Sequence, residues 1–157
     1  GYVMENNIEK VEVTIRSDGK PVPLRQFSEY FILLRACYVL ALDEVQFELD
    51  QDDGDVAVAE MTVESVTAAI TYRASTITPR ELEILASAEL PPHEELYLQN
   101  IVRRNPFDVV FLGIGIALAA ALIVSGGKFE FGLTKLKIEI PPLGEGIEKL
   151  RKAFRRK

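Results

Sequence analysis

The first part of the chain changes from a strand pattern to a helix pattern. Val11, Val13 and Ile15 alternate with polar residues, and this two-residue period predicts a half-buried strand. From Phe27 to Ala41 the apolar residues recur at helical spacing instead, which predicts a helix with one face in the core. The chain is therefore expected to turn between these two elements.

Beyond that helix the two-residue alternation returns. The stretches 45–49 and 56–58 predict two strands joined by an acidic turn over residues 50–55. The stretch 61–72 mixes β-branched residues with alanine, and we predict a strand there from the β-branched residues. Alternation over residues 96–102 predicts one further strand.

Between these strands lies a sequence typical of a helix start. Thr78 can accept a capping bond, Pro79 suits the first turn, and Glu81 can return the bond to the backbone of Thr78. This spacing predicts a short helix that ends near Ala88, ahead of Pro91.

The longest apolar stretch is Val109 to Gly127, 19 residues without a charge. As a helix it would measure about 28 Å, close to the roughly 30 Å of a bilayer's hydrocarbon core. Asn105 and Pro106 supply a cap and a first-turn proline, so we expect an all-apolar helix over about 106–125. Such a helix must be sheltered by lipid, by its own fold or by copies of itself.

One face of this predicted helix carries small side chains at every fourth position. A second helix can approach such a face closely, so these residues are candidates for helix packing. They are Gly113, Ala117, Ala121 and Ser125, with Gly115 and Ala119 repeating the spacing beside them.

The remaining residues predict a hairpin and a basic helix. Alternation over 129–133 and 136–140 predicts two strands, which the two prolines at 141–142 end. In the last segment, 145–157, apolar residues recur at helical spacing among basic ones. These basic side chains either complement the end of their own helix or contact an anionic lipid or a partner. They are Lys149, Arg151, Lys152, Arg155 and Arg156.

Together these patterns predict an α+β fold with a small mixed or antiparallel sheet, an amphipathic helix, the all-apolar helix and a short basic C-terminal helix. We expect an acidic body over 1–105, the apolar helix over 106–127, either transmembrane or buried, and a basic tail over 128–157, folding as one cooperative unit. Residues 1–125 carry 9 Lys plus Arg against 20 Asp plus Glu, whereas residues 126–157 carry 9 against 4. This asymmetry argues against nucleic acid as a partner of the body.

Candidate chemistry is sparse. His93 lies beside Glu94 and Glu95 but lacks a second histidine at a zinc-binding spacing, and the acidic turn does not match the register of a calcium loop. Cys37, the one cysteine, falls within a predicted core helix, where a thiol serves as a small hydrophobe. We therefore expect no catalytic residues, no metal and no cofactor.

The strand leading into RRNPFDVV and the apolar helix, within residues 96–125, resembles small uncharacterised bacterial proteins that accompany effector modules of conflict (defence) systems. The resemblance transfers no site residues and implies an accessory or membrane-acting role.

We therefore expect a non-enzymatic component, cytoplasmic or associated with the inner membrane, that acts through membrane insertion or self-association of the apolar helix. It would form homo-oligomers. In the alternative, the chain is a soluble protein-binding module whose central core element is that helix.

Overall fold

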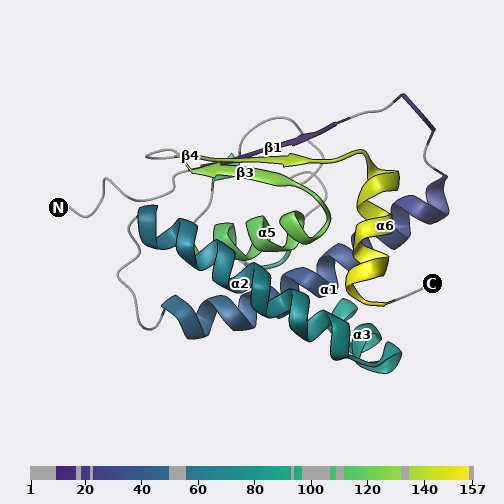
Figure 1. Ribbon diagram of the computed structural model, residues 1–157, viewed down its shortest axis with the longest axis horizontal. Helices are drawn as coiled ribbons and strands as arrows, with labels where there is room; N and C mark the ends of the chain where they lie inside the picture. The colour runs from purple at the N-terminus through teal and green to yellow at the C-terminus, as the bar shows by residue number, and fades with distance from the viewer. Residues whose placement is uncertain are drawn as a thin grey trace.

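A mixed four-stranded sheet and five helices make up the described part of the chain (Figure 1). The computed structural model describes residues 10–16, 19–21, 23–49, 56–92, 94–96, 107–108, 112–131 and 135–155. In chain order the elements are β1 (Lys10–Ile15), α1 (Leu24–Leu49), α2 (Val56–Thr76), α3 (Pro79–Ala86), β2 (Phe107–Asp108), α5 (Leu112–Val124), β3 (Lys128–Phe131), β4 (Lys135–Ile140) and α6 (Leu143–Ala153). The predicted α+β class is confirmed.

The sheet joins strands from both ends of the chain in the order β2-β1-β4-β3. β1 and β4 are parallel, with Val13 opposite Ile138. β3 pairs with β4 as the predicted antiparallel hairpin, and β2 pairs with β1 in antiparallel orientation. The expected body and the expected tail therefore share one sheet.

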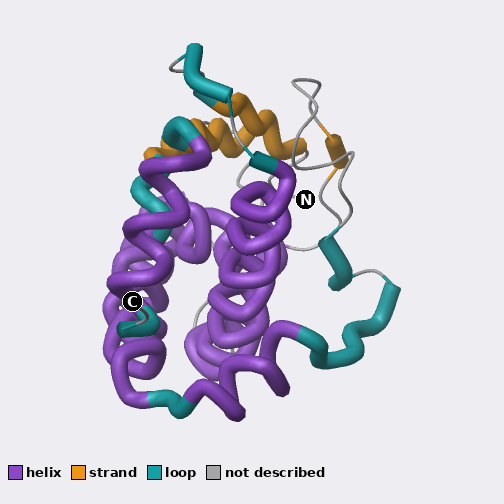
Figure 2. Tube along the Cα trace, turned by 90° about the vertical axis from the view of Figure 1, so that its right-hand side faces the viewer, coloured by secondary structure: helices purple, strands orange, loops and turns teal. Residues whose placement is uncertain are grey.

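The helix α5 lies between the sheet and the helices α1 and α2, as Figures 1 and 2 show from two directions. Every residue from Ile116 to Leu122 is at most 1% exposed. A helix with no polar face is stable in water only when its whole surface is covered, and here the chain itself covers this part of it.

The apolar helix is shorter than the sequence predicts. Phe107 and Asp108, expected in its first turn, instead pair with Val11 and Lys10 of β1. Hydrogen bonding to an edge of the sheet satisfies the backbone of these two residues, so the helix does not need to include them. At 13 residues α5 is about 20 Å long.

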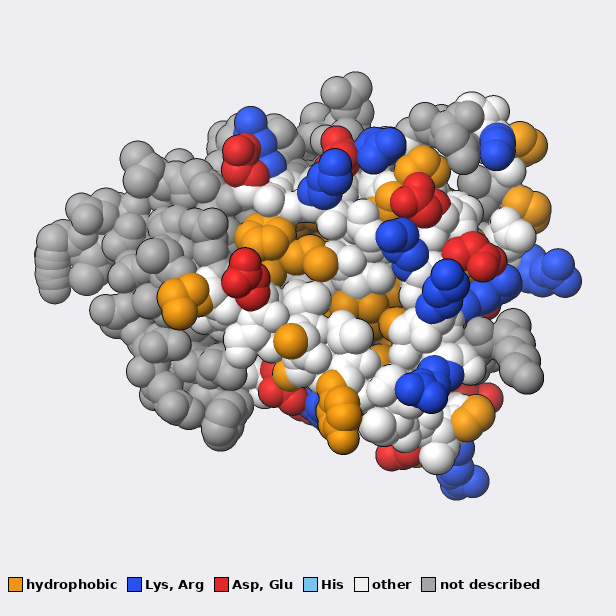
Figure 3. Space-filling model, viewed as in Figure 1, with side chains coloured by type: hydrophobic (Ala, Val, Ile, Leu, Met, Phe, Trp, Pro, Cys, Tyr) orange, Lys and Arg blue, Asp and Glu red, His pale blue; other side chains and the backbone are white. Residues whose placement is uncertain are grey.

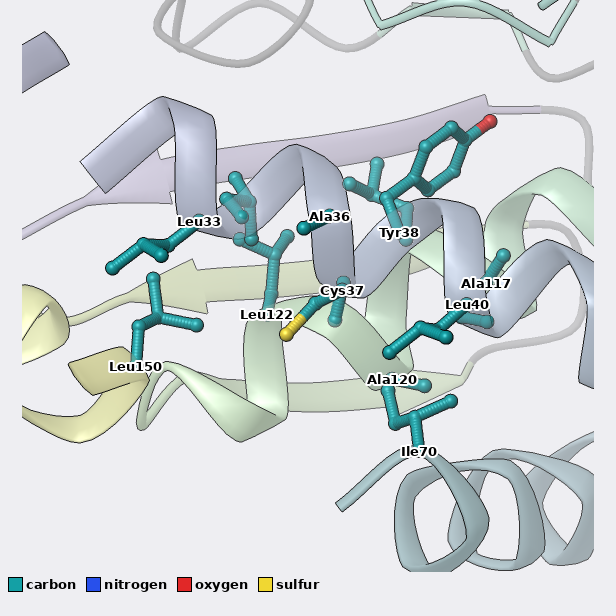
Figure 4. Packing of buried hydrophobic residues seen from close by; sticks show 14 of the residues in the cluster. Leu33, Ala36, Cys37, Tyr38, Leu40, Ile70, Ala117, Ala120, Leu122 and Leu150 are labelled. Carbon is teal, nitrogen blue, oxygen red and sulfur yellow. The ribbon is translucent and has the colours of Figure 1, made fainter. Parts of the chain in front are cut away.

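Small side chains allow α1 and α5 to pack closely. Ala36 and Cys37 of α1, and Ala117 and Ala120 of α5, are fully buried (Figure 4). α5 ends in a Schellman motif, in which the backbone N–H of Gly127 donates to the carbonyl of Leu122 at 2.8 Å. The close packing of α1 against α5 therefore covers the apolar helix within the chain itself.

Three predicted strands are wrong. Residues 45–49 continue α1, and residues 56–58 and 61–72 belong to α2. Among the described side chains of α2 the buried hydrophobic residues are Val63, Val66, Ile70 and Ala74, a helical spacing that β-branched composition obscured. Packing against α1 and α5 outweighs the weak strand preference of valine and isoleucine. Most of the strand expected over 96–102, and the acidic turn, lie outside the described residues.

Candidate binding surface

The predicted helix-packing residues of α5 lie in the core where the structure describes them. Ala117, Ala119, Ala121 and Ser125 are fully buried. Gly113 and Gly115 belong to α5, but their surroundings lie outside what the structure describes. The described part of the small-residue face is therefore covered within a single chain.

Ser125 links α5 to α1 through a buried hydrogen bond. Its hydroxyl donates to the carbonyl of Leu122 at 2.8 Å, which leaves the oxygen to accept from the hydroxyl of Tyr30 at 3.2 Å. Burial raises the pKa of Tyr30 to about 12. Gly146 of α6 allows this approach, because a Cβ there would lie only 2.7 Å from Cε1 of Tyr30.

The helix α6 is amphipathic, as predicted, and its apolar face is buried in the fold. Leu143, Ile147, Leu150 and Phe154 are at most 8% exposed. Any contact made by this helix with a partner must therefore use its outer, basic face.

The predicted contact residues of α6 divide into paired and unpaired groups. Arg151 donates two hydrogen bonds to Glu29 of α1, from Nε at 2.8 Å and from Nη2 at 2.5 Å, and these bonds raise the pKa of Arg151. Lys149, Lys152 and Arg155 are exposed and have no ion-pair partner among the described residues. Arg156, the remaining predicted residue, is outside the described part of the chain.

Several other sequence candidates receive no supporting geometry. Cys37 is fully buried, and burial raises the pKa of its thiol to about 12, so the thiol stays protonated at neutral pH. His93 lies outside the described residues, and the carboxylate of Glu95 is bound by Arg35. Within the described ranges, no three His, Cys, Asp or Glu side chains are grouped to hold a metal.

A hollow with a volume of about 870 Å³ lies between the start of α1 and α3. We call it the α1/α3 groove. Each helix presents residues from successive turns on one face, so the two helices form two facing rims. The lining residues are Arg25, Ser28, Glu29, Ile32 and Leu33 of α1, Pro79, Leu82, Glu83 and Ala86 of α3, and Ser87, which caps the end of α3.

Hydrogen bonds fix the first turn of α3 and hold its last turn beside α1. At its start the predicted capping box is confirmed: the backbone N–H of Glu81 donates to Oγ1 of Thr78 at 3.1 Å, and the N–H of Thr78 donates to Oε1 of Glu81 at 2.9 Å. At its end the guanidinium of Arg35 donates to the carbonyls of Ala86 and Ala88 at 2.9 and 2.6 Å. The groove is therefore formed before any partner arrives.

Arg35 also joins α1 to the segment that follows α3. It binds both carboxylate oxygens of Glu95, at 3.0 and 2.7 Å, and these bonds lower the pKa of Glu95. The hydroxyl of Tyr38 donates to the carbonyl of Glu94. These bonds keep the guanidinium of Arg35 oriented toward the last turn of α3.

A large apolar side chain remains in solvent at the α1/α3 groove. Ile32, which lines it, is 53% exposed. Ile84 of α3 is 59% exposed but is not among the lining residues. Arg25 and Glu83 also line it and have no ion-pair partner among the described residues, whereas Glu29 is bound by Arg151. The sequence signal for this surface was an isoleucine, Ile32, outside the core-facing residues of its helix.

Comparisons with protein-family models, with curated proteins and with solved structures find no match. Over the residues that the structure describes, no helix combines the length and the hydropathy needed to cross a membrane.

Proposed function

We propose that this protein is a non-enzymatic protein-binding module in which α5 is the central core element and the α1/α3 groove receives an amphipathic helix of a partner protein. The observation that carries the proposal is Ile32, which is 53% exposed in the lining of a preformed apolar hollow. Covering such a side chain contributes about 1.5–3 kcal/mol.

The shape of the groove favours a helix over a second copy of the same face. A two-fold dimer would place groove against groove and leave an unfilled space between the copies. A single helix is convex and can place apolar residues from successive turns between the two rims. Acidic and basic residues at its edges would meet Arg25 and Glu83.

Site-specific photo-crosslinking in the native cell tests this function. A photo-reactive phenylalanine analogue at Ile32 of α1 or at Glu83 of α3, both in the lining, should crosslink to a partner peptide with apolar residues at helical spacing. The same analogue at Tyr72 of α2, which is 71% exposed, is the matched control. A second variant, Ile32 crosslinker with Ala86→Glu, should lose the adduct while the helical circular dichroism is unchanged.

Two results would contradict the proposal. Equal crosslinking from Tyr72 would show that the partner does not bind preferentially at the groove. A crosslink to a peptide of this chain itself would show that a second copy, and not a partner protein, occupies the groove.

The expectation that α5 inserts into a membrane or self-associates stays a prediction, as does an accessory role in defence. Either action requires the buried segment Ile116–Leu122 to separate from the helices and the sheet that cover it. Flotation of the chain with lipid vesicles, and light scattering of the Gly113→Leu and Ala117→Leu variants, test the two actions.

A further inference from the structure

A second hollow lies on a different face, between α2, the end of α5 and α6. We call it the α2/α6 pocket, and its volume is about 430 Å³. In Figure 3, hydrophobic side chains form the floor of a hollow near the middle of this face, with Lys and Arg side chains on the α6 side. The lining residues are Thr67, Thr71, Ile123, Val124, Gly126, Lys149, Lys152 and Ala153.

One rim of the pocket is cationic. Lys149 and Lys152 are three residues apart on α6 and so lie on one side of it. Both are exposed, neither has an ion-pair partner among the described residues, and no Asp or Glu is part of the described lining. The stem of Lys149 lies against Gly126, where an added Cβ would be 2.6 Å from its Cδ.

The opposite rim carries hydroxyl groups. Thr67 and Thr71 are four residues apart on α2, again on one side of their helix. The hydroxyl of Thr71 donates to the carbonyl of Thr67 at 2.7 Å. Oγ1 of Thr67 is itself buried and has no hydrogen-bond partner among the described residues. A buried hydroxyl without a partner destabilises the free protein, so a ligand oxygen that accepts from it, once a rotation about χ1 turns it into the pocket, would gain affinity.

The floor is apolar, because Ile123 and Val124 of α5 and Ala153 of α6 supply only hydrocarbon. Both Ile123 and Val124 are half-buried. A ligand that fits the whole pocket therefore needs an anionic head and a short hydrocarbon part.

We infer that the α2/α6 pocket binds a phosphate monoester that carries an aliphatic chain. Two unpaired ammonium groups match the charge of a phosphate monoester, about −1.5 to −2 at neutral pH, better than they match a single carboxylate. The phosphate accepts from Lys149, Lys152 and Thr67, and the chain lies on Ile123 and Val124. This site is separate from the α1/α3 groove and does not depend on the proposed function.

Calorimetric titration of the full chain with hexyl phosphate tests the site. The Lys149→Gln/Lys152→Gln variant should bind at least about tenfold more weakly, since charge-assisted hydrogen bonds are among the stronger polar contacts. The matched control is Arg80→Gln, which removes an exposed cation of α3 outside the pocket and should leave the affinity unchanged. Equal affinity of the wild type and the double lysine variant overturns the inference.

The Thr67→Val variant tests whether the hydroxyl of Thr67 contacts the ligand or has only a structural role. The change keeps the shape of the side chain and removes the unpartnered hydroxyl. It should leave the urea midpoint unchanged or raise it, while hexyl phosphate binds about threefold or more weakly. Unchanged affinity in this variant overturns the assignment of Thr67.

The source of the phosphate is decided by two parallel arms. Flotation with vesicles of phosphatidylcholine containing phosphatidic acid tests a lipid headgroup, and hexyl phosphate tests a free ligand. Binding in either arm, lost in the double lysine variant, supports the site, and binding in neither overturns it. Inorganic phosphate should bind at least about tenfold more weakly than hexyl phosphate, because it leaves the apolar floor uncovered. Equal binding of the two overturns the role of the floor.

Discussion

The helices α5 and α6 differ in how much of their surface the rest of the chain covers. From Ile116 to Leu122 the chain covers α5 completely, between the sheet and two other helices. α6 buries only the face that carries Ile147 and Leu150, and its basic residues remain in solvent. The more hydrophobic helix thus provides the core, and the surfaces available for binding lie on the helices around it.

The largest expected effect is that of a charge placed in α5. Ala120→Glu puts a carboxylate at a position that is fully buried, and an unpaired buried charge costs several kcal/mol, comparable with the whole stability of a small domain. We expect the cooperative urea unfolding transition to disappear. Lys152→Glu, the same charge on the outer face of α6, should change the free energy of unfolding by no more than about 0.5 kcal/mol. Similar unfolding curves for the two variants would remove the distinction between the helices.

Alkaline pH should loosen the contact between α1 and α5. The pKa of Tyr30 and that of Cys37 are both raised to about 12 by burial. A raised pKa means that the folded state holds the proton more tightly than the unfolded chain. The resulting stability is fully present below the ordinary pKa values, 9.0 for the thiol and 10.0 for the phenol, and is lost as pH rises toward about 12.

Urea midpoints measured in steps from pH about 8 to about 11 follow this loss. In the Tyr30→Phe variant one of the titrating groups is absent, so the midpoint should fall less steeply with pH. An identical slope in the variant would mean that Tyr30 does not contribute.

Glycines at the end of α5 and at the start of α6 should respond in opposite directions. Gly126 has a φ of +95°, and Gly126→Ala should cost about 1–2 kcal/mol of unfolding free energy because a Cβ disfavours this conformation. Gly144, in the first turn of α6, has open space around its Cα, so Gly144→Ala should leave stability unchanged or raise it by up to about 1 kcal/mol. Thermal unfolding of the two variants compares them directly. A loss of stability in both would contradict the prediction that an added Cβ at Gly144 finds open space.

The smallest effect concerns the ion pair between α6 and α1. Arg151→Gln removes the contact with Glu29, whose side chain is 29% exposed, and should cost about 0.5–1 kcal/mol. The loss should shrink in high salt, because salt screens partly exposed charges. Lys149→Gln is the control, since Lys149 has no ion-pair partner among the described residues. Equal losses of unfolding free energy in the two variants would show that the loss comes from the overall charge of α6 and not from this ion pair.

The candidate surfaces were harder to predict than the elements that carry them. The basic residues of α6 were identified from the sequence, but the pairing of Arg151 with Glu29 separates it from Lys149 and Lys152. The hydroxyls of Thr67 and Thr71 fell in a segment predicted as a strand, where residues four apart share a face but lie about 13 Å apart, so their closeness over one helical turn was not visible. Ile32 lines a groove because Arg35 holds the end of α3 beside α1.

The sequence alone determined the features whose causes are local. The capping box at Thr78 and Glu81, the alternation of β3 and β4, and the amphipathic spacing of α6 each depend on residues a few positions apart. Tertiary structure decided the continuation of α1 past Val45, the helical state of α2 and the pairing of β1 with β4. These outcomes depend on burial against segments far away in the chain, and such contacts are stronger than the small intrinsic preferences that a local pattern reports.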